Sequence, residues 1–199
     1  MKTCSVECCN NKHYAKGYCK KHYYRTKRYG EPTKRNRSDI NEIIEHENYA
    51  EIILYDNYGK EKGIAKVDLD DIDKVKDYKW SMSHDYVYNS ITNMFLHRLI
   101  MNCPKDMVVD HINHNPLDNR KSNLRICTVS QNGMNAKIRN DNTSGVTGVG
   151  WDKKYNKWYA RIAIKGERIL LGYFNTKEEA VKARQEAEIK YFGKYRNQG

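Results

Sequence analysis

Long hydrophobic segments are missing from this sequence. No apolar run approaches the roughly 18 residues that a membrane-spanning helix needs, and the N-terminus MKTCSVECC lacks the apolar region of a secretory signal. Hydrophobic residues make up only 39% of the 199 residues, and the mean hydropathy is −0.94. There is also no internal repeat. We therefore expect no membrane-spanning helix and no single large core, but several small modules supported by a metal or by shared packing.

The charge is strongly positive and unevenly distributed. The formal net charge is +11, which indicates a polyanionic partner, either a nucleic acid or an anionic membrane surface. Residues 1–38 contain 11 Lys and Arg against 2 acidic residues, whereas residues 39–94 contain 6 against 13. The remainder of the chain is basic again. Two basic ends around an acidic middle predict a binder made of several modules.

The N-terminal 30 residues concentrate cysteine. Four of the six cysteines fall within residues 4–19 and His22 follows, giving the spacing C-x₄-C-x₉-C-x₂-H for Cys4, Cys9, Cys19 and His22. Sulfur and nitrogen ligands in this number favour tetrahedral Zn²⁺. Cys8 could replace Cys9, and free buried or redox-active thiols are the alternative. The segment thus predicts a structural zinc site in a basic module, followed by a polar linker over residues 31–48.

The basic and aromatic residues after the cysteines suit nucleic acid. The run HYYRTKRYGEP, residues 22–32, alternates bases with aromatic rings, which favours contact with phosphates and base planes. A solvated basic face is the alternative.

Residues 49–106 favour short strands and short helices. AEIILY and IAKVD indicate strands, and LDDIDKVKDY indicates a short helix with acidic residues near its start. KWSMS and YVYNSI alternate as in a hairpin with His84 and Asp85 at the turn. FLHRLIMNC is apolar on one face and ends at Pro104, so it predicts a helix.

The stretch VVDHINHNPLDNRKSNLRICTVSQN, residues 108–132, predicts a strand–loop–strand–helix metal site. Asp110 and His111 are neighbours in a strand, so their side chains point to opposite faces. Asn132 lies near the start of the following helix, from which it can reach the same ion as Asp110. Oxygen ligands favour Mg²⁺ or Mn²⁺ over Zn²⁺. His111 is then the general base for water attack, and Asn123 can pin the loop and orient His111.

The other polar residues around this stretch have open roles. His97 is expected to brace the site as a structural residue. Arg120 and Arg125 are either phosphate contacts or solvated charges.

With its Asp-His pair and its asparagines, this stretch resembles the HNH endonucleases of the phage and homing type. GIAKVDLDDIDKVKDYKW and LHRLIM are similar to the N-terminal half of such proteins, where they support the nuclease. The resemblance implies a domain over residues 49–142, with a ββα-metal core at about 107–138. It implies metal-dependent hydrolysis that leaves a 5′-phosphate and a 3′-hydroxyl.

Residues 143–199 predict a three-stranded sheet and one helix. The strands are VGVGW, WYARIAI and RILLGYF, and Thr176 with Glu179 forms a capping box before the helix. Alternation places Tyr159 and Arg161 on the face away from the helix. Here the chain resembles the DNA-binding domain of plant ethylene-response factors, which lays its sheet in the major groove. The resemblance implies that Arg168 shares the outer face, and the DNA contacts that we expect are Lys153, Lys154, Tyr159, Arg161 and Arg168.

Taken together, the sequence predicts an α+β protein of several modules: a zinc segment, a ββα-metal nuclease and a three-stranded sheet with one packed helix. The predicted function is endonuclease action on double-stranded DNA, with no membrane partner and no small-molecule substrate. We expect a monomer in the cytoplasm, phage-encoded or bacterial. The alternatives are a DNA-binding regulator with a vestigial nuclease site and, less favoured, an RNA-binding protein.

Overall fold

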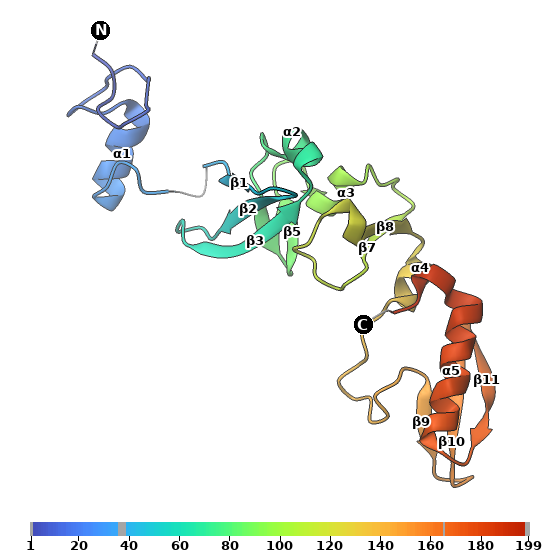
Figure 1. The fold of residues 1–199 in the computed structure, drawn as a ribbon. Helices are drawn as coiled ribbons and strands as arrows, with labels where there is room; N and C mark the ends of the chain where they lie inside the picture. Colours follow the sequence, from blue (N-terminus) through green and yellow to red (C-terminus); the bar gives the residue numbers. More distant parts are fainter. Residues whose placement is uncertain (1, 36–38, 165, 198–199) are drawn as a thin grey trace.

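A computed structural model describes residues 2–35, 39–164 and 166–197. Its parts follow one another in space as they do in sequence (Figure 1). The N-terminal segment carries helix α1 (Lys20–Tyr29), the central part carries strands β1 to β8, and the C-terminal module consists of β9 to β11 with helix α5 (Lys177–Phe192). The structure is therefore a mixed α and β fold with small sheets.

Helix α1 follows directly after the last cysteine of the cluster. It begins after Cys19 and ends at Gly30, whose φ of 78° is the left-handed conformation that glycine adopts at helix ends. The helix buries His22 and Arg25. The guanidinium of Arg25 forms an ion pair with Asp39, which ties the helix to the start of the central part.

The expected linker over residues 31–48 is shorter in the structure. Residues 36–38 lie outside the described residues, but β1 (Ile43–Glu45) pairs antiparallel with β2 (Ala50–Tyr55). Buried Asn41 donates to the carbonyls of Ile53 and Trp80, at 2.8 and 3.0 Å. The polar composition of residues 31–48 predicts a linker. In the structure, however, the Asn41 side chain supplies hydrogen-bond partners to buried backbone groups inside the fold.

The central part is built from small antiparallel sheets. The first contains β1, β2 and β3 (Glu61–Val67), and the second contains β4 (Ser81–Ser83), β5 (Tyr86–Asn89) and β6 (Met94–Phe95). Between them lie the 3₁₀ turn η1 (Leu69–Asp71) and helix α2 (Ile72–Val75). Their apolar faces share one core around Trp80, which is fully buried.

The predicted hairpin between β4 and β5 is confirmed. Ser83 pairs with Tyr86 across a two-residue turn. At the turn, His84 and Asp85 have φ values of 48° and 70°. Two consecutive positive φ values are typical of a tight turn whose twist matches the flanking strands.

The predicted ββα unit follows. Helix α3 (Leu96–Ile100) leads into β7 (Val108–His111), which pairs antiparallel with β8 (Leu124–Cys127), and helix α4 (Val129–Met134) closes the unit. The 3₁₀ turn η2 (Lys121–Asn123) precedes β8. The loop between the strands rests on the first sheet, because Lys66 of β3 bonds to the backbone of Leu117 and Asn119. The sheet of β1, β2 and β3 thus supports the loop of the site.

In the C-terminal module, β10 (Lys157–Ile164) lies between β9 (Val149–Asp152) and β11 (Glu167–Phe174). Helix α5 packs on the sheet through Ala180 and Ala187, with the predicted capping box of Thr176 and Glu179 in place. Gly148 precedes the sheet with a φ of 82°, and a Cβ there would lie 2.3 Å from the carbonyl oxygen of Arg161. Only glycine fits this approach.

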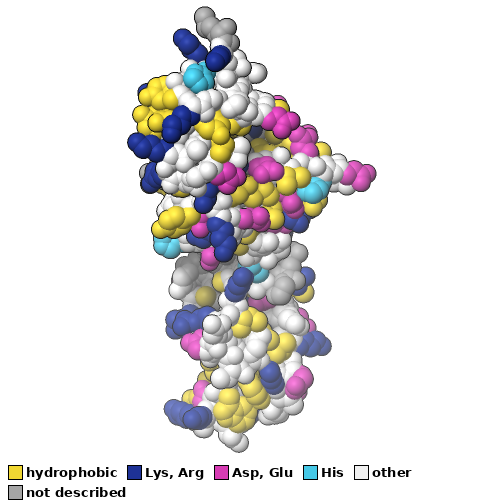
Figure 2. Space-filling model, turned by 90° about the vertical axis from the view of Figure 1, so that its left-hand side faces the viewer, with side chains coloured by type: hydrophobic (Ala, Val, Ile, Leu, Met, Phe, Trp, Pro, Cys, Tyr) yellow, Lys and Arg dark blue, Asp and Glu magenta, His cyan; other side chains and the backbone are white. Residues whose placement is uncertain are grey.

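The charge asymmetry of the sequence is visible on the surface. In Figure 2, Asp and Glu side chains are most frequent over the central part, and Lys and Arg side chains lie toward both ends. Within the described residues, no helix is long and apolar enough to cross a membrane.

Candidate active site

A cleft of about 420 Å³ opens at the ββα unit. It is lined by Asp110 and His111 from β7 and by Asn132 from α4, and the β4–β5 turn with His84 and Asp85 forms part of its wall. The structure therefore brings the expected base and both expected metal ligands to one cavity.

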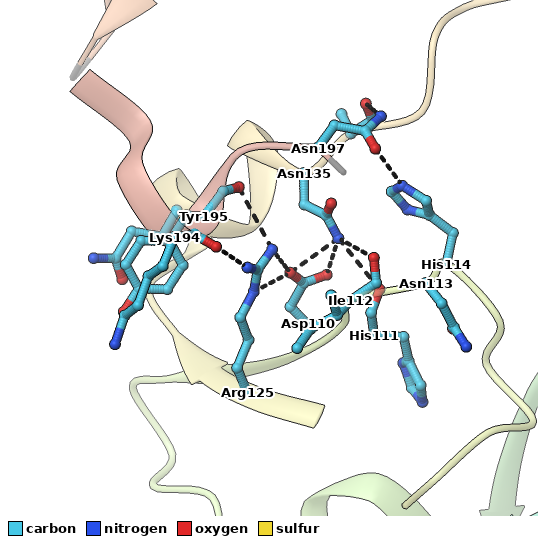
Figure 3. A network of polar contacts seen from close by, with 12 residues as sticks. Asp110, His111, Ile112, Asn113, His114, Arg125, Asn135, Lys194, Tyr195 and Asn197 are labelled. Atoms are coloured by element: carbon cyan, nitrogen blue, oxygen red, sulfur yellow. Dashed lines mark hydrogen bonds and ion pairs between the residues drawn. The ribbon is translucent and has the colours of Figure 1, made fainter. Parts of the chain in front are cut away.

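Asp110 is buried and held by two side chains (Figure 3). The Arg125 guanidinium contacts Oδ2 through Nε at 2.8 Å and Nη2 at 2.6 Å. The amide nitrogen of Asn135 lies 3.0 and 3.1 Å from the two carboxylate oxygens. These donors compensate for the burial of the carboxylate.

His111 is enclosed by aromatic rings. It lies 5.1 Å from the ring of His97 and 5.9 Å from that of Tyr86, between centroids. Burial lowers the pKa of His111, although a hydrogen-bond contact with Asn119 and the charge of Asp110 act in the opposite direction. A lowered pKa leaves the imidazole neutral at pH 7, which is the state that a base requires.

His97 has the structural position that the sequence suggested. Its ring stacks on Phe95 and is 7% exposed. Burial, with a contribution from nearby His111, lowers its pKa to about 3. His97 is therefore a neutral packing residue behind His111.

Asn123 occupies the corner of the loop. Its side-chain oxygen accepts from the backbone N–H of Asn113 at 2.9 Å, and its amide donates to the carbonyl of Asp118 at 2.8 Å. These two bonds close the loop that follows His111, as expected for a residue that orients the base.

Asn132 within α4 and Asn135 at its C-terminal end have different environments. Asn132 is exposed at the cleft, whereas Asn135 at the end of α4 is buried and contacts Asp110. Sequence reasoning missed Asn135. The signal that could have found it is the capping box of Thr128 and Gln131, which sets where α4 begins and therefore which residues face β7.

The structure does not favour DNA contact by Arg125. Its side chain is 13% exposed and is committed to Asp110 and to the carbonyls of Lys194 and Tyr195. Arg120 is half-exposed and pairs with Asp118 at 2.7 Å. The sequence does not reveal that Arg125 on β8 pairs with Asp110 on β7, because this contact depends on the register of the two strands.

The four predicted zinc ligands converge. The ligand atoms of Cys4, Cys9, Cys19 and His22 all lie within 4.8 Å of one another. Hydrogen-bond geometry to the backbone of Cys19 and to His22 outweighs burial and lowers the pKa of Cys4 to about 6, which favours the thiolate. Cys8 is exposed and outside this group, so the cluster contains Cys9.

Three of the predicted DNA-contact residues of the C-terminal module, Tyr159, Arg161 and Arg168, share one face of the sheet. Arg161 and Arg168 are exposed, and Arg168 pairs with Ala163 across the sheet, on the same side as Tyr159. Lys153 and Lys154 are exposed in the β9–β10 turn. Tyr159 lies across Gly150, where a Cβ would come within 2.6 Å of its hydroxyl. The small residue therefore lets the tyrosine ring lie flat on the face.

Comparisons with known proteins agree with this site. The family described as HNH endonuclease matches residues 95–134. Protein 3.8 of Escherichia phage T7 is 35% identical over 65 residues, a match that spans 33% of this chain and about half (54%) of the phage protein. An uncharacterized HNH endonuclease of Acanthamoeba polyphaga mimivirus, L560, is 31% identical over 153 residues, covering 72% of this chain and 79% of the relative. No solved structure matches the chain. With this relative matched over most of its length and the family match centred on the cleft, the chain belongs to the HNH endonucleases.

Proposed function

We propose that this protein is a metal-dependent endonuclease of the phage or homing type that hydrolyses a phosphodiester bond of double-stranded DNA. The products are a 5′-phosphate and a 3′-hydroxyl. The observation that carries the proposal is the convergence of Asp110, His111 and Asn132 on one cleft of an HNH-family domain. The expected cytoplasmic setting stays a prediction.

The cleft suits a hard cation such as Mg²⁺ or Mn²⁺. Asp110 and Asn132 offer oxygen donors, the type that these ions prefer. The buried Oδ1 of Asn135, beside Asp110, lacks a hydrogen-bond partner among the described residues. It is the amide nitrogen of Asn135 that meets the Asp110 carboxylate, and the oxygen is directed away from it (Figure 3). Asn135 therefore orients Asp110, and the fit to a cation depends on the oxygen atoms of Asp110 and Asn132. When bound, the ion supplies stabilisation of negative charge on the phosphate and leaving oxygens.

The chain's own residues supply the proton transfer. His111 takes a proton from the attacking water, and its neutral state at pH 7 is favoured by burial. Asn123 holds the loop that follows His111 and so helps to fix the position of the imidazole.

Two modules hold the DNA on either side of the cleft. The N-terminal segment, with Zn²⁺ on Cys4, Cys9, Cys19 and His22, presents its basic helix α1. The C-terminal sheet presents Arg161 and Arg168 for base edges and Lys153 and Lys154 for phosphates, with Tyr159 between them.

A regulator with a vestigial nuclease site is the second candidate. It is supported by the ion pair between Asp110 and Arg125, since a cation in the cleft has to share the carboxylate with this arginine. The intact set of Asp110, His111, Asn123 and Asn132 favours the nuclease.

Cleavage of supercoiled plasmid carrying genomic inserts tests the proposal. We expect conversion to open circle or linear DNA with Mg²⁺ and none with EDTA. His111→Ala should lower the rate about 10²- to 10⁴-fold while DNA binding persists. His46→Ala is the matched control, because His46 stacks on Tyr49 outside the cleft.

Undiminished cleavage by the His111 variant would contradict the role of this residue. Tight binding without cleavage by the natural sequence would favour the regulator. Open circle as the only product would indicate nicking by a monomer with one site per chain.

A further inference from the structure

The end of the C-terminal module returns to the nuclease site. After α5, the 3₁₀ turn η3 (Gly193–Tyr195) and Asn197 lie against β8 and α4 (Figure 3). We call residues 193–197 the C-terminal tail. It is about 70 positions away in sequence from the residues that it touches in the ββα unit. A module that only anchored DNA would not need these contacts.

Arg125 is the centre of the contact. On one side its guanidinium meets Oδ2 of Asp110. On the other side it donates to the backbone carbonyls of Lys194 and Tyr195 and lies 5.2 Å from the centre of the Tyr195 ring. The planar fork of arginine can serve both sides at once, which a lysine cannot do.

The tail has a second attachment beside the cleft. The side-chain oxygen of Asn197 lies 3.1 Å from Nε2 of His114, and its amide donates to the carbonyl of Ala136 at 3.2 Å. His114 and Ala136 both line the cleft that holds Asp110 and His111. The tail therefore touches the site at two separate points.

We propose that Arg125 is a positioning residue for Asp110, and that the C-terminal tail holds Arg125 in place, so that the nuclease site is complete only with the tail docked. The inference rests on the proposed function. Nε and Nη2 of Arg125 both contact Oδ2 of Asp110, so the arginine fixes the carboxylate from one side. Partners that orient a metal-binding carboxylate typically contribute 10- to 100-fold in metal affinity or activity.

Without the tail, the arginine loses its carbonyl acceptors. A largely buried guanidinium has five N–H donors and needs acceptors for them. Once the carbonyls of Lys194 and Tyr195 are gone, water becomes the competing acceptor and Arg125 is free to leave Asp110. The carboxylate then changes its orientation, and the effect reaches the metal site without any change in the residues that face DNA.

The test compares four zinc-loaded chains: the natural sequence, Arg125→Met, a chain that ends at Gly193, and the two changes combined. Mn²⁺ binding, followed by electron paramagnetic resonance, and single-turnover cleavage are measured on each. We expect Arg125→Met to weaken Mn²⁺ binding about tenfold and to slow cleavage about 10- to 100-fold, with DNA affinity within about threefold. Truncation should act in the same direction. Combined with Arg125→Met it should add less than about twofold, because both changes act through one contact.

Two further variants define the mechanism. Arg125→Lys should recover part of the lost Mn²⁺ affinity, since it keeps a hydrogen-bond donor that can orient Asp110 but not the fork. Arg139→Met is the matched control, because Arg139 is a surface arginine that pairs with Asp141 and is 84% exposed. Circular dichroism checks that each chain is folded.

Unchanged Mn²⁺ binding and cleavage in Arg125→Met or in the truncated chain would overturn the inference. So would faster cleavage after truncation, which would make the tail a brake, or fully additive effects, which would mean that the tail acts independently of Arg125. If the natural sequence cleaves no DNA, the proposed function fails. Mn²⁺ affinity then decides this inference by itself.

Discussion

The N-terminal segment and the central part are held together by different forces. The central part buries a continuous apolar core that includes Trp80, Ile52 and Leu54. In residues 2–30, the buried side chains are Cys4, Cys19, His22 and Arg25. The apolar clusters of the described residues all lie in the other two parts. A segment of this size cannot bury enough apolar surface to fold, so ligand chemistry has to replace the core.

Loss of one predicted zinc ligand should have the largest effect, and it should affect only the N-terminal segment. Cys19→Ala removes a buried member of the cluster, and binding free energies of structural zinc sites are on the order of 10–16 kcal/mol. We expect zinc content near zero and rapid proteolysis within the N-terminal segment, with the unfolding temperature of the remainder unchanged. Mass spectrometry and calorimetry measure both.

Cys8→Ala is the control for this change, because Cys8 is exposed. It should keep the zinc. If chelation of zinc also unfolded the central part, the two regions would not be independent.

Truncation of Trp80 should instead destabilise the central part and leave the N-terminal segment unaffected. Trp80 is fully buried and its ring N–H donates to the carbonyl of Val75. Trp80→Ala should cost about 3–5 kcal/mol of unfolding free energy, while zinc content persists. Urea unfolding measures the cost, and Tyr58→Ala, at an 85% exposed position, should change it by less than about 0.5 kcal/mol.

Acid should destabilise the central part through His97. Its pKa is about 3 in the folded protein against 6.5 normally, so between these values the unfolded state binds more protons and stability falls as the pH falls. From pH 7 to pH 5 the loss should be about 2 kcal/mol. His97→Phe should remove this part of the loss, because the ring already stacks on Phe95. An equal pH dependence in both proteins would refute the assignment.

The smallest expected effects concern single DNA contacts on the C-terminal face. Arg161→Ala and Arg168→Ala should each reduce the dependence of log affinity on log salt by about 1 if they contact phosphate. An arginine that reads a base instead costs sequence discrimination of about 1–3 kcal/mol. Lys76→Ala, in the acidic middle, is the control and should change neither. Affinity titrations at several salt concentrations separate the cases.

Local signals predicted most elements correctly. The turn at His84 and Asp85 and the capping box at Thr176 depend on residues next to one another in sequence, and both are present. The convergence of the four zinc ligands also follows from short spacing. The linker over residues 31–48 is predicted from a polar composition and a proline, and a buried polar side chain such as that of Asn41 cannot be distinguished from a solvated one by sequence.

The sequence by itself determined the chemistry available to this protein: the cluster of three cysteines and His22, the Asp-His pair and the basic residues of the C-terminal sheet. Tertiary structure alone decided which groups meet Asp110. Arg125 reaches it through strand register, Asn135 through the end of α4, and the C-terminal tail through docking of a separate module. The physical reason is that a buried charge recruits whatever partners the fold brings close. Closeness across the chain is a property of packing, which residue spacing does not encode.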